Sequence, residues 1–209
     1  MVTTMKKKQL EMFLQKIPDF NQPKPSFEQY QTPATIAADI LFYAYQNHDI
    51  LNKTVVDLGC GTGMFTVGSK VLNAKHVIGI DIDVDCISLA ESFAQKHHLD
   101  ITFLVQDILK SDFSADTVIM NPPFGAQKAN QHADRVFLEK AIRNASVVYS
   151  LHLTKTVPFL TKMIRSFNAT IDDRFKISFP LKGQFTFHKK LMGRVSVSCL
   201  RIIHLPAEE

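Results

Sequence analysis

The sequence has few cysteines and no long apolar run. Its three cysteines, Cys60, Cys86 and Cys199, show no paired spacing, so a disulfide framework is not predicted and a reducing cytoplasmic setting is expected. No stretch approaches the roughly 20 apolar residues that a membrane-spanning helix needs, and residues 1–8 lack the apolar core of a signal peptide. We therefore expect a soluble protein with no membrane partner.

Metal binding is not expected either. The eight histidines show no recognisable ligand spacing with cysteine or carboxylate. Asp81, Asp83 and Asp85 imitate the start of a calcium loop, but Cys86 stands where that loop needs glycine and Ser92 where it needs glutamate. The acidic triplet is therefore interpreted as the end of a strand followed by a helix cap.

The alternation of apolar patterns predicts an α/β fold. At 209 residues the chain is expected to be a single domain, with an N-terminal helical segment at 1–50, a central core at 51–155 and a sheet-closing part at 156–209. Regular alternation of strands and helices favours a parallel sheet with helices on both faces. The expected helices are 6–17, 33–47 (with Thr32 as its N-cap), 64–72, 83–97, 134–145 and 156–168; the expected strands are 54–58, 76–80, 101–105, 116–120, 146–150, 170–179 and 193–203, the last two separated by Pro180 and a basic stretch.

The most informative motif is Asn121-Pro122-Pro123-Phe124, which follows an apolar strand pattern. Two consecutive prolines lack N–H groups and push the residues before them toward extended backbone, so the carbonyls of the turn are presented outward. Asn121 adds an amide oxygen, and Phe124 adds a ring on which a heteroaromatic base can stack. The motif predicts a clamp for a planar amino group; the alternative is a structural Pro-Pro turn.

A glycine-rich turn follows the first expected strand. Gly59, Gly61 and Gly63 allow a ligand to approach the backbone closely at the carboxyl end of a strand. Met64 stands where a dinucleotide fingerprint needs its third glycine, so hydride chemistry on NAD is not favoured.

Carboxylates end the next two expected strands. Asp81 lies where a bound ribose needs an acceptor for its hydroxyls, and Asp107 follows the third strand. We therefore expect these strand ends and the glycine turn to converge on one cleft.

These motifs resemble those of the Rossmann-like S-adenosylmethionine-dependent methyltransferases. In order and spacing they are similar to the methyltransferase-like five family of small-subunit ribosomal RNA N6-adenine methyltransferases and its archaeal relatives. The resemblance covers nearly the whole chain, and it rests on Glu28-Gln-Tyr-Gln-Thr-Pro33, Asp57-Leu-Gly-Cys-Gly-Thr-Gly63, Gly79-Ile-Asp-Ile-Asp83, Asn121-Pro-Pro-Phe-Gly125, Val148-Tyr-Ser-Leu-His152 and Phe187-His-Lys-Lys190.

The resemblance implies a class I methyltransferase fold, with a seven-stranded, mostly parallel sheet closed by an antiparallel C-terminal strand pair. It also implies S-adenosylmethionine as cofactor, with the amino-acid part at the glycine turn, the ribose at Asp81 and the adenine at Asp107 and Ile108. Without the resemblance, Thr32 is interpreted equally well as a helix cap, and Gln29 equally well as a solvated loop residue. The implied cofactor-binding residues are Gln29, Thr32, Asp57, Gly59, Gly61, Thr62, Gly63, Met64, Asp81, Ile82, Asp107 and Ile108.

The implied catalytic residues are Asn121, Pro122, Pro123 and Phe124, which would bind an adenine amino group and aim its nitrogen lone pair at the donated methyl group. RNA contacts are expected in two polar segments. One carries Lys128, and the other carries Phe187, His188, Lys189 and Lys190. The alternative for the second segment is a solvated basic hairpin.

Other functions fit the same motifs. N2-guanine methyltransferases and protein glutamine methyltransferases use the same clamp, because guanine and a carboxamide also present planar amino groups. Phe124 stands where the protein methyltransferases commonly have tyrosine, which favours RNA. Outside catalysis, the chain would be a cofactor-binding ribosome assembly factor.

The resemblance also implies a partner. Eukaryotic members of the family bind a small zinc-containing activator protein at an edge of the sheet. In the expected strand order residues 101–105 form such an edge, and this strand is apolar on both faces. The alternative is that helices and loops of the same chain cover it.

Overall fold

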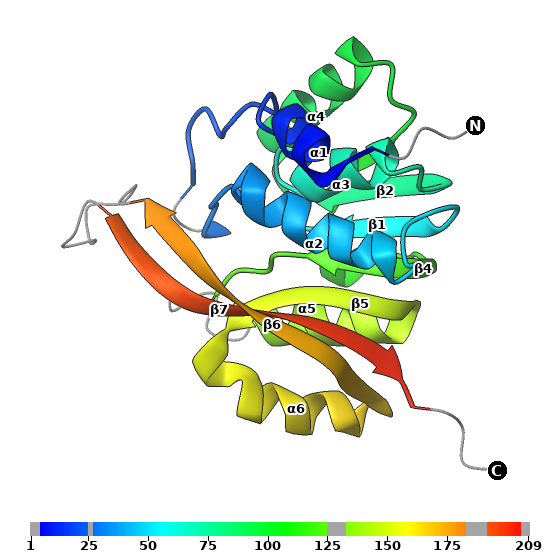
Figure 1. Ribbon diagram of the computed structural model, residues 1–209, viewed down its shortest axis with the longest axis vertical. Helices are drawn as coiled ribbons and strands as arrows, with labels where there is room; N and C mark the ends of the chain where they lie inside the picture. Colours follow the sequence, from blue (N-terminus) through cyan, green and yellow to red (C-terminus); the bar gives the residue numbers. More distant parts are fainter. Residues whose placement is uncertain (1–4, 25–26, 125–132, 183–191, 206–209) are drawn as a thin grey trace.

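The computed structural model describes residues 5–24, 27–124, 133–182 and 192–205, which form a three-layer α/β arrangement (Figure 1). The helices and strands follow in the order α1 (Lys7–Leu14), α2 (Ala34–Gln46), β1 (Thr54–Leu58), α3 (Met64–Val71), β2 (His76–Asp81), α4 (Val84–Lys96), β3 (Thr102–Val105), β4 (Ala115–Met120), α5 (Ala133–Asn144), β5 (Ala145–Leu153), α6 (Val157–Ser166), β6 (Ala169–Lys182) and β7 (Met192–His204). Short 3-10 helices, η2 (Ile108–Lys110) and η4 (Thr154–Thr156), follow β3 and β5.

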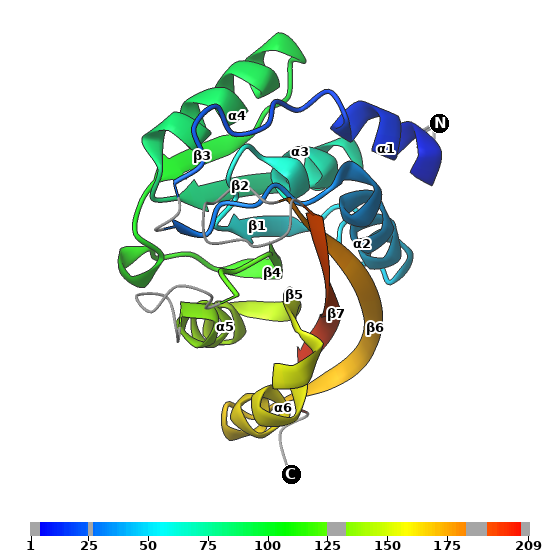
Figure 2. The same ribbon diagram turned by 90° about the vertical axis from the view of Figure 1, so that its left-hand side faces the viewer.

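The seven strands form one sheet in the order β3-β2-β1-β4-β5-β7-β6. The first five strands of the chain pair in parallel, whereas β7 pairs antiparallel with both β5 and β6. The predicted fold class, a mostly parallel sheet closed by an antiparallel C-terminal pair, is therefore confirmed. Figure 2 shows the β6–β7 pair curving away from the parallel strands.

The two faces of the sheet bury separate apolar cores. On one face α1, α2 and α3 pack on side chains such as Val55 and Ile119. On the other face α5 and α6 pack on side chains such as Val56 and Val118. Neighbouring residues of β1 thus point to opposite cores, as the two-residue period of a strand requires. Figure 2 shows α2 and α5 on opposite sides of the sheet.

A buried polar cluster fixes β7 to the parallel part of the sheet. The Tyr149 hydroxyl, on β5, donates to the Asp49 carboxylate at 2.5 Å, and Arg201 Nε, on β7, donates to the same Asp49 Oδ2 at 2.9 Å. The carboxylate has two hydrogen-bonding partners, which offsets the cost of removing it from water.

Two local expectations are corrected by the structure. Thr32 does not cap α2: Pro33 occupies the N-cap position, without a side-chain cap bond, and the helix begins at Ala34. Pro180 does not end β6, which continues through it to Lys182. A proline is tolerated there because β6 is an edge strand that pairs only with β7.

Other local expectations are confirmed. Asp83 is the N-cap of α4, and its carboxylate accepts the Asp85 N–H at 3.1 Å. Strand β3 is an edge of the sheet, with Leu104 and Val105 exposed. None of the helices in the described ranges is long and apolar enough to span a membrane.

Candidate active site

A cavity of about 230 Å³ lies at the carboxyl ends of four neighbouring parallel strands. Residues from the ends of β1, β2, β3 and β4 line it, so the expected convergence of the strand ends is confirmed. Parallel α/β sheets bind ligands at this edge. The lining residues are Phe20, Phe27, Glu28, Gln29, Tyr30, Gly59, Gly61, Asp81, Ile82, Asp107, Ile108, Asn121, Pro123, Ala133 and Phe137.

The glycine turn after β1 forms the floor of this cavity. Gly59, Gly61 and Gly63 all have positive φ angles, of 71°, 53° and 92°, which other residues rarely adopt. A Cβ atom on Gly59 would meet the Phe137 ring at 3.0 Å, and one on Gly61 would meet the Phe20 ring at 3.2 Å. Only glycine leaves both the backbone conformation and the space that a closely approaching ligand needs.

Two carboxylates of the cavity wall accept hydrogen bonds from nearby backbone N–H groups. Asp81 Oδ2 accepts the Gly61 N–H at 2.8 Å, and Asp81 Oδ1 accepts the Asp83 N–H at 2.9 Å. Burial raises the pKa of the Asp81 carboxyl above its usual value. Asp107 Oδ1 accepts the Leu109 N–H at 3.0 Å and caps η2. Because a carboxylate has about four lone-pair sites, each of these groups retains acceptor capacity for a ligand.

Asp57 lies behind the glycine turn and not on the cavity wall. It is 1% exposed, and its Oδ2 accepts both the backbone N–H and the hydroxyl of Thr66, at 2.9 and 2.6 Å. Burial raises the pKa of this carboxyl to about 7. Asp57 therefore fixes the start of α3, on which the turn ends.

Three further residues of the turn are set back from the cavity. Thr62, Gly63 and Met64 do not line it; the Thr62 hydroxyl accepts a hydrogen bond from Gln31 Nε2 at 3.0 Å, and Met64 belongs to the core around α3. Their contact with the cofactor stays a prediction.

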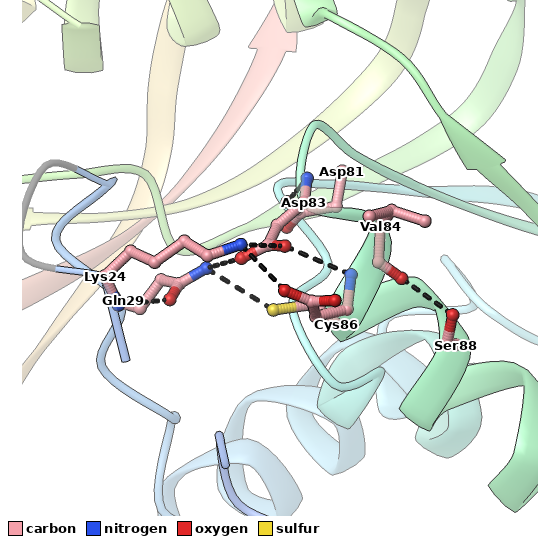
Figure 3. Close-up of polar contacts among 8 residues, drawn as sticks. Lys24, Gln29, Asp81, Asp83, Val84, Cys86 and Ser88 are labelled. Atoms are coloured by element: carbon pink, nitrogen blue, oxygen red, sulfur yellow. Dashed lines mark hydrogen bonds and ion pairs between the residues drawn. The ribbon is translucent and has the colours of Figure 1, made fainter. Parts of the chain in front are cut away.

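The segment between α1 and α2 covers the cavity, and polar contacts hold it in place (Figure 3). Lys24 Nζ donates to Asp83 Oδ1 at 2.7 Å and to Asp85 Oδ2 at 2.9 Å. Gln29 Nε2 donates to Asp83 Oδ2 at 2.7 Å and approaches Cys86 Sγ at 3.4 Å. We call residues 18–24 and 27–33 the strap.

Sequence reasoning missed most of the strap. Phe20, Phe27 and Tyr30 line the cavity, but they lie between two expected helices and were not predicted as site residues. Their concentration in that connection is the signal that could have identified them, because three aromatic side chains in a short connection need a surface on which to pack.

The Asn121 side chain has one partner at its nitrogen and none at its oxygen. Asn121 Nδ2 donates to Thr32 Oγ1 at 3.1 Å, whereas Oδ1 is buried without a hydrogen-bond partner among the described residues. The amide oxygen is thus left as a free acceptor. Thr32 does not cap the helix and does not line the cavity. It orients the Asn121 amide, which lines the cavity.

The remaining motif residues are divided between two surroundings. Pro123 lines the cavity, and Pro122 is buried. The Phe124 ring packs edge-to-face on Phe179, with 5.8 Å between ring centroids. The predicted RNA contacts Lys128, Phe187, His188, Lys189 and Lys190 lie outside the described residues.

Comparison with known proteins agrees with this geometry. The family model of the methyltransferase small domain matches residues 34–148. The rRNA N6-adenosine-methyltransferase METTL5 of Danio rerio is 38% identical to the chain, over 94% of the chain and 98% of that protein. An uncharacterised protein of Methanocaldococcus jannaschii is 40% identical, over 98% of the chain and 97% of that protein.

A solved structure matches over almost the full length. The crystal structure of a candidate RNA methyltransferase from Pyrococcus horikoshii superposes with a TM-score of 0.89 at 34% identity, covering 97% of the chain and 99% of that protein.

Proposed function

Because the chain belongs to the methyltransferase-like five family of S-adenosylmethionine-dependent methyltransferases, we propose that it methylates the N6 amino group of an adenine in RNA, namely small-subunit ribosomal RNA. The METTL5 proteins of Danio rerio and Drosophila melanogaster, which act on rRNA N6-adenosine by name, support adenine in rRNA as the substrate. The choice of the small subunit rests on the resemblance alone.

The residues of the first cavity fit S-adenosylmethionine. The glycine turn leaves room for close backbone approach, and Asp81 and Asp107 offer acceptors to ribose hydroxyls and to the adenine amino group. Ile82, Ile108 and the strap aromatics supply apolar walls. The chemistry that the bound cofactor supplies is an electrophilic methyl group on a sulfonium.

The free Asn121 oxygen is the observation that carries the proposal. Because Thr32 holds the nitrogen end of the amide, Oδ1 is fixed as an acceptor for one N–H of the target amino group. The Pro122 carbonyl accepts the second N–H. Accepting both N–H bonds favours a pyramidal nitrogen, and these bonds strengthen as positive charge develops on that nitrogen. The proton leaves after methyl transfer, so no general base is invoked.

Replacing Asn121 with Ala tests this clamp. We expect turnover to fall by about 10²-fold or more, the size seen when one charge-stabilising group is removed from an active site. Cofactor affinity should stay near that of the wild type. The measurement is methyl transfer to small-subunit ribosomal RNA, followed by mass spectrometry of its nucleosides.

A second variant grades the effect. Thr32→Val should lower turnover several-fold, because the amide loses the bond that fixes its orientation, worth about 1 kcal/mol. Thr35→Val is the matched control, since the Thr35 hydroxyl donates to Glu11 on an exposed surface away from the cavity. Full activity of the Asn121→Ala variant would refute the clamp.

The modified nucleoside decides between substrates. N6-methyladenosine supports the proposal, whereas N2-methylguanosine would identify a guanine methyltransferase. Methylation of protein glutamine without RNA methylation would replace the proposed substrate class altogether. Cofactor binding with no methylated product in RNA or protein would point to an assembly factor.

We further propose that a small zinc-containing activator protein binds the β3 edge. Leu104 and Val105 are 38% and 52% exposed on this strand, and Leu109, which follows it, is 66% exposed. An exposed apolar edge strand is a template for pairing with another chain. The resemblance to family members that bind such an activator supports this partner.

A further inference from the structure

A second cavity, of about 340 Å³, adjoins the Asn-Pro-Pro-Phe motif. Phe124 lines it, whereas Asn121 and Pro123 line the cofactor cavity. The other walls come from the start of α5 and from the segment after β5, which includes η4 and the first turn of α6. Residues of the catalytic motif therefore line both cavities.

An aromatic ring and a guanidinium are stacked at this second cavity. Phe159 is 48% exposed, although burial of such a side chain would be favourable by about 1.5–3 kcal/mol. The Arg135 guanidinium carbon lies 4.3 Å from the Phe159 ring centroid. Stacking on the ring holds the planar guanidinium in a defined orientation, and such groups bind phosphate through paired N–H donors.

The positive charges at this cavity form no ion pair with a described carboxylate. Within the described ranges, neither Arg135 nor the exposed Lys155 forms an ion pair with an acidic side chain. Asp134 also lines the cavity, and its Oδ2 lies 3.6 Å from Nδ1 of the buried His152, a nitrogen that makes no hydrogen bond with a described residue. Among the described residues, two cations and one carboxylate therefore line the cavity, which leaves an excess of positive charge for an anionic ligand.

A similar pairing of arginine and phenylalanine lies at the opposite end of α5 and α6, but there the arginine forms an ion pair. Arg143 lies two turns after Arg135 on α5, and its guanidinium carbon is 5.1 Å from the Phe167 ring centroid. Arg143 Nε, however, donates to Glu139 at 3.0 Å. Arg143 is therefore ion-paired away from the motif, whereas Arg135 beside the motif forms no ion pair with a described residue.

We propose that the second cavity is a flanking subsite, which binds a single-stranded nucleotide next to the target adenine. Its base stacks on the face of the Phe159 ring opposite the Arg135 guanidinium, and its phosphates contact Arg135 and Lys155. An exposed aromatic beside two cations is the combination with which proteins bind single-stranded nucleic acid. The inference rests on the proposed RNA substrate and adds to it the residues that hold the strand.

Binding of a fluorescein-labelled oligoadenylate of roughly eight nucleotides tests the flanking subsite. Measured by anisotropy, Phe159→Ala should weaken binding about tenfold, as expected for the loss of one base–aromatic stack, whereas Phe159→Tyr should retain it. Arg135→Ala and Lys155→Ala should each lower the slope of log affinity against log salt by about 0.7. The same variants should raise the KM for small-subunit ribosomal RNA.

Arg143→Ala is the matched control and should change neither the affinity nor the salt slope. Calorimetric titration with S-adenosylhomocysteine on every variant verifies that the cofactor cavity is intact. Suppose that the wild type methylates RNA and that the Phe159, Arg135 and Lys155 variants bind the oligonucleotide with wild-type affinity. The proposed subsite is then refuted, whereas the proposed function stands. If the wild type neither binds nor methylates RNA, or methylates only protein, both are wrong.

Discussion

At the scale of single residues, Asp57 couples the stability of the fold to pH. Its carboxyl has a pKa of about 7 in the folded protein, against the ordinary 3.8. Between these values the folded state keeps a proton that the unfolded state has lost. The free energy of unfolding therefore falls as pH rises from about 4 to 7, by about 1.4 kcal/mol per pH unit at most.

Asp57→Asn should remove this dependence, because asparagine is neutral and can still accept from Thr66. As pH rises from about 4 to 7, the free energy of unfolding of the variant should increasingly exceed that of the wild type. Above pH 7 this difference should level off, at a few kcal/mol in order of magnitude. Urea unfolding of both proteins between about pH 4 and 8 measures it. Parallel curves would mean that Asp57 titrates at its ordinary pKa.

The sequence predicted the position of Asn121 but not its orientation. Asn121 was recognisable because two prolines and an aromatic follow it, a local pattern. The bond from Asn121 to Thr32 joins residues 89 positions apart, on different elements. Such a contact depends on how the strap lies across the sheet, and a local pattern contains no information about that.

At the scale of elements, the strap forms one wall of the cofactor cavity, to which Phe20, Phe27 and Tyr30 contribute. The ion pairs of Lys24 with Asp83 and Asp85 hold this wall against the start of α4. A cofactor bound in the cavity is therefore retained in part by these contacts.

Lys24→Met should weaken cofactor binding several-fold, mainly through faster dissociation, because the strap loses both ion pairs. Added salt should weaken cofactor binding of the wild type and have less effect on the variant. Stopped-flow measurement of cofactor release detects the change. Lys7→Met is the matched control, since Lys7 forms an exposed ion pair with Asp39 away from the cavity; equal effects of the two substitutions would exclude a role for the strap contacts.

The sequence predicted which segments are helices and which are strands more accurately than it predicted where each of them ends. The parallel strands and their connecting helices were placed within a few residues, because each carries a strong apolar period. The structure extends β6 through Pro180, where sequence reasoning ended the strand. A proline is tolerated in β6 because β6 is an edge strand, and the strand order is known only from the assembled sheet.

At the scale of the whole molecule, the two edges of the sheet differ. Strand β6 at one edge is 14 residues long, whereas β3 at the other edge has four residues and exposes apolar side chains. The exposed β3 edge is where we propose that the activator binds.

Val105→Lys should abolish binding of the activator and reduce self-association of the isolated chain, because a charged edge strand resists pairing. Co-purification of the chain with the activator, and light scattering of the chain alone, measure the two effects. Met12→Lys serves as the control, since Met12 is 58% exposed on α1 and lies outside the sheet. A wild-type chain that is monomeric and fully active without any partner would contradict the proposal.

The order of the last strands also constrains how the chain folds as it is synthesised. Strand β7 is the last of the seven strands in the sequence but lies between β5 and β6, and β6 has no other neighbour in the sheet. Until residues 192–204 are synthesised, β6 has no strand to pair with and the inner edge of β5 stays open. A nascent chain that lacks these residues therefore exposes two strand edges at which wrong pairing can occur.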